Sequence, residues 1–154
     1  MKLRGIKAFP GMEDSILPWM GKTMKELDLF VSAALSQQGV NLTRKQMICM
    51  KILEEHGPLP QSELAFLTDR DKTSLTRLIN SMEKKNVVAR IPSETDKRVN
   101  LVHLTTSGRK LLAKTAPIMV KMVKKLESSI TKEDREAFKR VLKQIHQNIE
   151  SQSK

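Results

Sequence analysis

Apolar residues recur at steps of four and three residues between Ser15 and Gln38, a spacing that places them on one side of an α-helix. The series consists of Met20, Met24, Leu27, Val31 and Ala34. Pro18 is acceptable only near the first turn of such a helix, and Gly39 is a residue that ends one. The series is long and narrow, so we expect this helix to face another helix rather than a small core.

Two shorter helices are predicted next. Thr43 is a good N-cap for a helix that Gly57 and Pro58 close. A short helix over residues 62–67 follows Pro60. The apolar residues of the first helix are Met47, Met50, Ile52 and Leu53.

A turn over residues 68–70 leads to Asp71, whose carboxylate can cap the next helix. That helix is predicted from Lys72 to Lys85, and Asn86, which tolerates the left-handed conformation, ends it. Two β-type runs follow, and the polar residues between them indicate a hairpin with a long loop. These runs are Val87–Ile91 and Val99–Leu104, with the loop at 92–98.

The chain ends in two predicted helices. Thr105 or Thr106 caps the first, which reaches about Ser129 and is expected to bend at Pro117. The second begins after Thr131 with a capping-box-like sequence. Its apolar series is Phe138, Val141, Leu142, Ile145 and Ile149. The predicted fold class is therefore mainly α with a small β-hairpin.

Composition narrows the class of protein. The 154 residues suit one compact fold, and no apolar run approaches the ~18 residues of a membrane helix. The first 20 residues lack the apolar stretch of a secretion leader, and a single cysteine fits reduced cytosol, so we expect a cytoplasmic protein. The net charge of +11 attracts polyanions, and an aromatic content of 3% disfavours binding of single strands by stacking. Duplex DNA fits this balance better.

The order of elements between Leu59 and Leu104 is that of a winged helix-turn-helix, in which the second helix reads DNA. A helix fits the major groove, and its N-terminal side chains reach the base edges there. The candidate contacts in and before this reader helix are Arg70, Lys72, Thr73, Ser74, Thr76 and Arg77. The competing interpretation, that these residues merely decorate a solvated face, is favoured for any one of them alone but not for the group.

The predicted hairpin, or wing, carries the basic residues Arg90, Lys97 and Arg98. An arginine at a loop tip can enter the narrow minor groove, where the potential is most negative. Asp96 would repel phosphate if it were free, so we expect it to support the wing by holding a neighbouring arginine in a bidentate pair. The alternative is an ordinary run of surface charge.

These segments resemble the MarR family of regulators. The similar stretches are Leu42-Thr43 with Gln46, Ser62–Ala65, Asp71–Leu78, Glu83–Lys85, Asp96–Arg98, and Val102–Thr105 with Gly108. The resemblance covers residues 42 to about 112 and implies a homodimer with intertwined terminal helices, the reader helix in the major groove and Arg98 in the minor groove. The chain departs from the family pattern at Ser93, Lys97, Asp69 and Asn86.

The two outer apolar series also predict a dimer without reference to any family. The small winged core cannot cover both, and exposed apolar area costs about 25 cal/mol per Å². The expected interface residues are Met20, Met24, Leu27, Val31, Phe138, Val141, Leu142 and Ile145. Folding of these helices onto one another within a monomer is the alternative. We divide the chain into an N-terminal arm and dimerisation helix (1–38), a DNA-binding region (39–104) and C-terminal dimerisation helices (105–154).

The predicted function is that of a dimeric repressor that binds a palindromic duplex in a sequence-specific way. The prediction includes a small effector that could release the repressor from DNA. The alternatives are an interaction module whose basic surface binds an acidic partner or a membrane, and an RNA-binding protein. We expect no enzyme activity, cofactor or metal, because no catalytic pair is recognisable and the three histidines lie far apart. Cys49, between Ile48 and Met50, is expected to be a core residue rather than a redox sensor.

Overall fold

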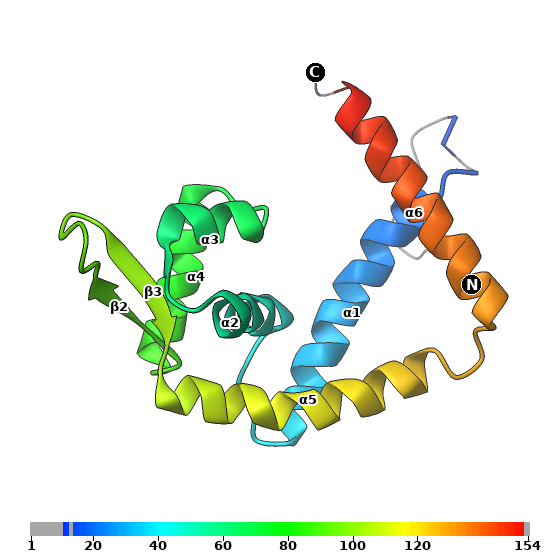
Figure 1. Ribbon diagram of the computed structural model, residues 1–154. Coiled ribbons are helices and arrows are strands. Elements are labelled where there is room, and N and C mark those ends of the chain that lie inside the picture. The colour runs from blue at the N-terminus through cyan, green and yellow to red at the C-terminus, as the bar shows by residue number, and fades with distance from the viewer. Residues whose placement is uncertain (1–10, 13, 153–154) are drawn as a thin grey trace. The chain divides into compact units, whose positions relative to one another are not determined.

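The computed structural model describes residues 11–12 and 14–152 of the chain (Figure 1). In chain order its elements are α1 (Leu17–Gln37), α2 (Arg44–His56), β1 (Leu59–Pro60), α3 (Gln61–Leu67), α4 (Lys72–Lys84), β2 (Val88–Pro92), β3 (Asn100–Leu104), α5 (Thr106–Leu126) and α6 (Lys132–Gln152). The chain forms two compact units, one ending at Ile118 and one beginning at Met119. The mainly helical fold with a small sheet is as predicted.

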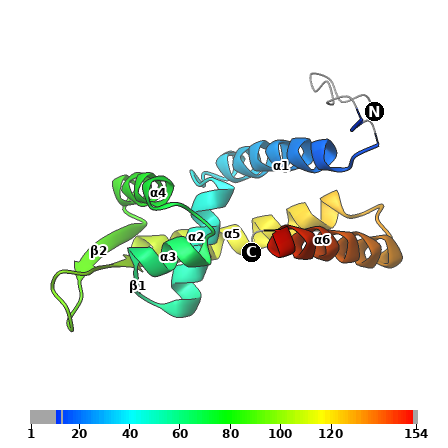
Figure 2. The same cartoon turned by 90° about the horizontal axis from the view of Figure 1, so that it is seen from above.

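The sheet contains one strand more than the predicted hairpin. β2 and β3 pair antiparallel from Val88 opposite Leu104 to Pro92 opposite Asn100. The two residues of β1 pair antiparallel with the other edge of β3, so the strand order is β1-β3-β2 (Figure 2). A strand of two residues that ends in a proline has no recognisable alternation of apolar and polar residues, which is why the sequence did not predict it.

The core of the first unit joins α1 to the winged region. Side chains from α1, α2, α3, α4 and β3 are at most 1% exposed; they are Leu35, Met50, Leu64, Leu75, Ile79, Val102 and Leu104. Cys49 is also fully covered, as expected of a core residue. The apolar face of α4 therefore lies inward, and its polar face is left for solvent or a ligand.

The helix boundaries follow the predicted capping residues. Thr43 and Gln46 form a capping box at the start of α2. The Thr105 hydroxyl accepts the backbone N–H of Gly108 at 2.9 Å, so Thr105 rather than Thr106 caps α5. The Thr131 hydroxyl accepts the backbone N–H of Asp134 at 3.1 Å at the start of α6.

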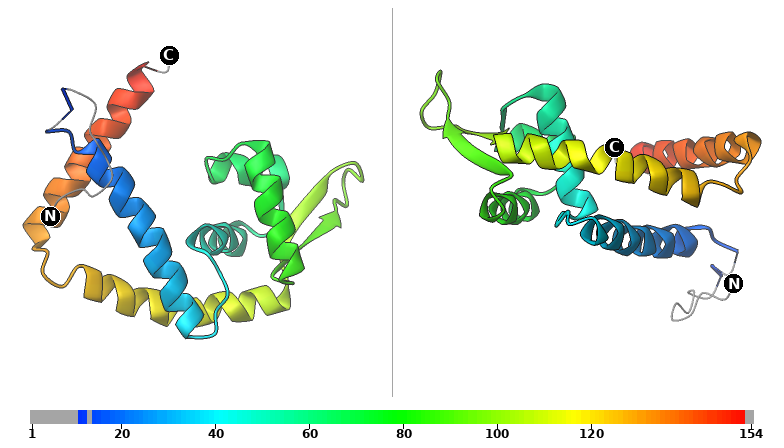
Figure 3. Two further views of the ribbon diagram at one scale, coloured as in Figure 1. Left: turned by 180° about the vertical axis from the view of Figure 1, so that it is seen from behind. Right: turned by 90° about the horizontal axis from the view of Figure 1, so that it is seen from below.

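The turns on either side of α4 use the left-handed conformation that the sequence indicated. Asp69 has φ 48° in the turn before α4, and Asn86 has φ 54° just after it. Both residue types tolerate positive φ better than most, because their short polar side chains can bond locally. These turns lead the chain from α3 into α4 and from α4 into the hairpin, which extends away from the helices with its loop at the free end (Figure 3).

The C-terminal helices differ from prediction in one boundary. α5 ends at Leu126 rather than near Ser129, and Pro117 lies inside it. None of the side chains of α6 is buried in the described chain. Within the described ranges, no helix has the combination of length and apolarity that a membrane crossing requires.

Candidate nucleic-acid interface

The first turns of α4 present three polar side chains that have no partner among the described residues. The Asp71 carboxylate accepts the backbone N–H of Ser74 at 2.7 Å and so caps the helix at its start. Lys72, Thr73 and Arg77 are exposed, and none makes a side-chain hydrogen bond or ion pair with another residue that the structure describes. Their donors are therefore available to a ligand.

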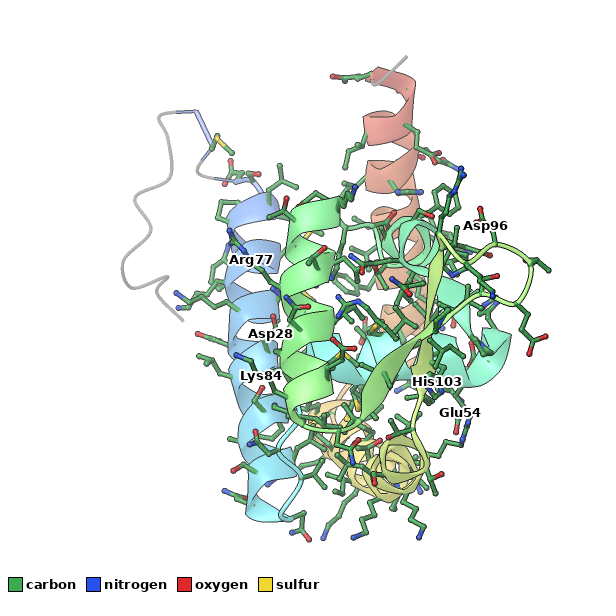
Figure 4. The ribbon with its side chains drawn as sticks, turned by 90° about the vertical axis from the view of Figure 1, so that its left-hand side faces the viewer. Asp28, Glu54, Arg77, Lys84, Asp96 and His103 are labelled. Atoms are coloured by element: carbon green, nitrogen blue, oxygen red, sulfur yellow. The ribbon has the colours of Figure 1, made fainter. Side chains whose placement is uncertain are left out.

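Lys84, which was not among the predicted contacts, extends this polar face. It lies seven residues after Arg77, so the two side chains share one side of α4, and both are exposed (Figure 4). The signal was present in the sequence as the spacing of these two cations on a predicted helix.

Other predicted contacts of the reader helix are already hydrogen-bonded within the chain. Arg70 Nη1 donates to Ser74 Oγ at 3.0 Å across the start of α4. Thr76 Oγ1 accepts from Gln61 Nε2 at 2.6 Å and donates to the Lys72 carbonyl oxygen at 2.8 Å. These groups therefore brace the helix-turn-helix and have less bonding capacity left for a ligand than Thr73 or Arg77.

Arg90, predicted as a DNA contact, anchors β2 of the wing to α4. Its guanidinium forms an ion pair with Glu83 through Nη1, and Nη2 donates to Asn80 Oδ1 at 3.0 Å. Its Nε donates to Gln61 Oε1 at 3.4 Å, and its backbone N–H donates to Glu83 Oε1 at 3.1 Å. The charge of Arg90 is thus balanced inside the protein, which the sequence could not reveal because the partners lie on two other elements, α3 and α4.

The support that Asp96 provides in the wing loop is different from the predicted bidentate pair. Among the ion pairs of the described residues, none joins Asp96 to an arginine. Instead Asp96 Oδ1 accepts the backbone N–H of Arg98 at 2.9 Å, and the Asp96 carbonyl accepts that of Val99 at 2.9 Å. The carboxylate shapes the loop through the main chain, because a backbone donor two residues away is closer than any guanidinium.

Ser93 completes this loop. It is 8% exposed, and its hydroxyl accepts the backbone N–H groups of Thr95 at 3.3 Å and Asp96 at 3.4 Å. Lys97 and Arg98 remain exposed at the loop without an ion pair or side-chain bond to another described residue. The loop therefore offers two free cations from a hydrogen-bonded backbone.

A second polar cluster, which the sequence did not predict, joins the loop before α2 to the end of α4. Lys85 Nζ donates to the Asn41 carbonyl at 2.8 Å and to Gln46 Oε1 at 3.0 Å. Gln46 is only 4% exposed, and its Nε2 donates to Ser81 Oγ at 2.9 Å. Burial lowers the pKa of Lys85 because the charged ammonium loses water there.

The predicted interface residues divide into one core residue and seven with exposed surface. Val31 is 1% exposed, so α1 already buries it within the single chain and it leaves the candidate interface. Met24, Phe138 and Val141 are 43%, 56% and 43% exposed. The half-buried members are Met20, Leu27, Leu142 and Ile145.

The structure also bears on the reactivity of Cys49 and on potential metal ligands. Burial raises the pKa of the Cys49 thiol to about 12, so the reactive thiolate is absent at neutral pH. In the part of the chain that the structure describes, no three His, Cys, Asp or Glu side chains are grouped so that they could hold a metal ion.

A capped helix with an outward polar face, a preceding short helix and a cation-bearing hairpin define a winged helix-turn-helix protein. Residues 42–99 match the model of the MarR family. The match spans 58 of the 154 residues, and over these residues the chain is similar to the MarR family.

The chain is also similar to individual relatives. It is 26% identical over 91 residues to the HTH-type transcriptional regulator YpoP of Bacillus subtilis, a match that covers 59% of this chain and 62% of YpoP. It is 31% identical over 88 residues to the HTH-type transcriptional repressor NicR of Pseudomonas putida, which covers 56% of each protein. The chain thus spans less than two thirds of the length of either relative.

A solved structure shares the fold over more of the chain. A cysteine-to-serine mutant of MarR from Escherichia coli, complexed with operator DNA, superposes with a TM-score of 0.80 at 21% identity. The similarity covers 90% of this chain and 99% of that one. It shows that the chain shares the fold of that structure.

Proposed function

We propose that this chain is a sequence-specific transcriptional regulator that binds duplex DNA as a homodimer and acts as a repressor. In this proposal α4 enters the major groove and the β2–β3 wing enters the neighbouring minor groove. NicR is named as a repressor, and the similar MarR structure contains operator DNA, which supports the same activity here.

One observation carries the proposal. Five exposed cations on α4 and in the wing loop have no side-chain hydrogen bond or ion pair among the described residues, and a hydrogen-bonded network holds together the elements that carry them; they are Lys72, Arg77, Lys84, Lys97 and Arg98. Cations on a rigid scaffold can neutralise phosphates without first losing much side-chain or loop entropy. A solvated face of a structural helix has no need for such a scaffold.

The dimer and the division of the chain are part of the same proposal. We assign residues 1–38 and 105–154 to dimerisation and 39–104 to DNA binding. Exposed apolar side chains on α1 and α6 support this, because a second chain would remove them from water. A twofold dimer requires a palindromic operator with half-sites about one helical turn apart, roughly 34–36 Å.

The remaining parts of the proposal concern regulation and location. A small effector would release DNA if it bound more tightly to a dimer whose two α4 helices are wrongly spaced for the operator. We assign the protein no enzyme activity and a cytoplasmic location with the DNA that it would bind.

Selection of bound duplexes from a random library, followed by salt titration, tests the function. The full chain should prefer the selected palindrome over random duplex by about 10³-fold or more, and log K should fall linearly with log salt. Equal affinity for selected and random duplexes at every salt concentration would overturn the proposal.

Two alanine variants separate the roles of reader and wing. Arg98→Ala should weaken binding and reduce the salt slope by about 0.9, because one cation that neutralises phosphate charge is lost. Arg77→Ala should instead change the preferred sequence, costing about 1–3 kcal/mol against the wild-type operator. Lys110→Ala, which removes one exposed cation from α5, is the matched control and should change neither property.

A further inference from the structure

Gln61, the first residue of α3, lies where the reader helix and the wing are joined. Its side chain bonds to both at once: Nε2 donates to Thr76 Oγ1 on α4 at 2.6 Å, and Oε1 accepts from Arg90 Nε and Nη2 on β2 at 3.4 and 3.3 Å. An amide is suited to this position because it donates at one end and accepts at the other. A leucine of similar size could make neither bond.

The bonds continue from Gln61 along the whole length of α4. The Thr76 hydroxyl also donates to the Lys72 carbonyl oxygen in the first turn of α4, at 2.8 Å. Near the C-terminal end of α4, the Arg90 guanidinium donates to Asn80 and Glu83. The Glu83 carboxylate also accepts the backbone N–H of Arg90. The wing strand is therefore attached to α4 at two points and to α3 at a third.

This network connects the wing strand β2 to the helix that carries the free cations of the reader. Bonds that involve ions are stronger and more directional than neutral ones, and a connected network restrains its members more than isolated pairs do. Successive base pairs are about 3.4 Å apart along the duplex axis. A shift of the wing by a few ångströms relative to α4 would change which base pairs Arg98 and Arg77 reach together.

We propose that Gln61 is a positioning residue that sets the spacing between the major-groove and minor-groove contacts, and so contributes to sequence selectivity without touching a base. This inference rests on the proposed function. It also gives Thr76 and Arg90 a different role. The sequence predicted that both contact DNA, whereas in this inference both hold α3, α4 and β2 together.

The test uses Gln61→Leu and Thr76→Val in the full chain, with duplexes that carry the selected operator or the same operator with one base pair inserted or deleted between the reader and wing positions. Each variant should lose about fivefold to tenfold of the preference for the original spacing, since each removes hydrogen bonds from one network. The double variant should lose no more than the more severe single one, because both changes break the same Gln61–Thr76 bond.

Gln37→Leu is the matched control, since Gln37 is an exposed glutamine of α1 outside the network. It should retain the wild-type preference. Melting temperatures are measured in parallel, because a purely structural role would lower stability and the active fraction while leaving the ratio of affinities among duplexes unchanged.

The outcomes distinguish this inference from the function on which it rests. If the wild-type chain shows no preference for any duplex, the proposed function fails. If the wild-type chain is selective and Gln61→Leu and Thr76→Val keep its spacing preference within twofold, the function stands and the positioning role of Gln61 is overturned.

Discussion

At the scale of single residues, the same side-chain type has different chemistry according to its neighbours. Arg90 and Arg98 both belong to the basic wing, yet Glu83 balances the charge of Arg90, while Arg98 has no ion-pair partner among the described residues. Sequence patterning treats the two alike, because it records charge but not whether that charge is already satisfied. The free cations are therefore the better candidates for DNA contact.

The thiol of Cys49 gives a prediction at this scale. Its pKa is raised from 9.0 to about 12, because the fully covered side chain has no water to stabilise a thiolate. In the unfolded chain the thiol ionises from about pH 9, whereas the folded chain keeps its proton to about pH 12. The free energy of unfolding should therefore fall between these values by about 1.4 kcal/mol per pH unit from this group alone.

Urea denaturation from pH 8 to 10.5 measures this slope, with Cys49→Ala as the comparison. The variant should be less stable at pH 8 because it leaves a cavity, but its stability should fall less steeply above pH 9. A thiol reagent should also react with the native protein far more slowly than with the denatured chain. Equal slopes for the two proteins would show that the thiol is not held protonated by burial.

At the scale of elements, most helix ends were predictable from the sequence. Thr43 and Asp71 cap α2 and α4 as expected, since a capping side chain bonds to a backbone N–H only three residues away. The end of α5 and the existence of β1 could not be predicted from the sequence. Pro60 and Leu59 become a strand only because β3 lies beside them, and such pairing between distant segments leaves no local signal.

A pair of glycine substitutions tests how tightly the elements are joined. A Cβ on Gly108, in the first turn of α5, would overlap the carbonyl oxygen of Val87 at the base of the wing. Gly108→Ala should therefore cost about 2 kcal/mol or more of unfolding free energy, because backbone must move. Gly21, inside α1, has no atom within 4 Å of an added Cβ. Gly21→Ala should stabilise the protein by about 0.5–1 kcal/mol through helix propensity.

Thermal or chemical denaturation of the two variants measures both effects. The changes in unfolding free energy should have opposite signs, although both variants replace a helical glycine with alanine. Equal stabilities for Gly108→Ala and wild type would contradict the close approach of α5 to the base of the wing.

At the scale of the whole molecule, the single chain leaves much apolar surface exposed on its outer helices. Phe138 and Ile149 of α6 are 56% and 60% exposed, and Leu29 of α1 is 65% exposed. An isolated exposed apolar residue is common, but a series at helical spacing is typical of a face that another chain covers. This surface supports the proposed dimer.

The proposed dimer predicts the effect of a charge on this face. Phe138→Glu should weaken dimerisation by about tenfold to a hundredfold, since burying a phenyl side chain contributes about 1.5–3 kcal/mol. Gln144→Glu, on an exposed polar position of the same helix, adds the same charge and should leave the dimer intact. Sedimentation equilibrium measures both constants, and an unchanged constant for Phe138→Glu would remove α6 from the interface.

The sequence by itself determined the order of the elements, the capping residues and the location of the basic residues. These follow from periodicity, from bonds between near neighbours and from composition, all of which act over a few residues of chain. Only the tertiary structure decided which polar residues are free. Gln61, Thr76, Glu83 and Arg90 meet because α3, α4 and β2 pack together, and contacts between segments far apart in the chain arise from packing rather than from local sequence.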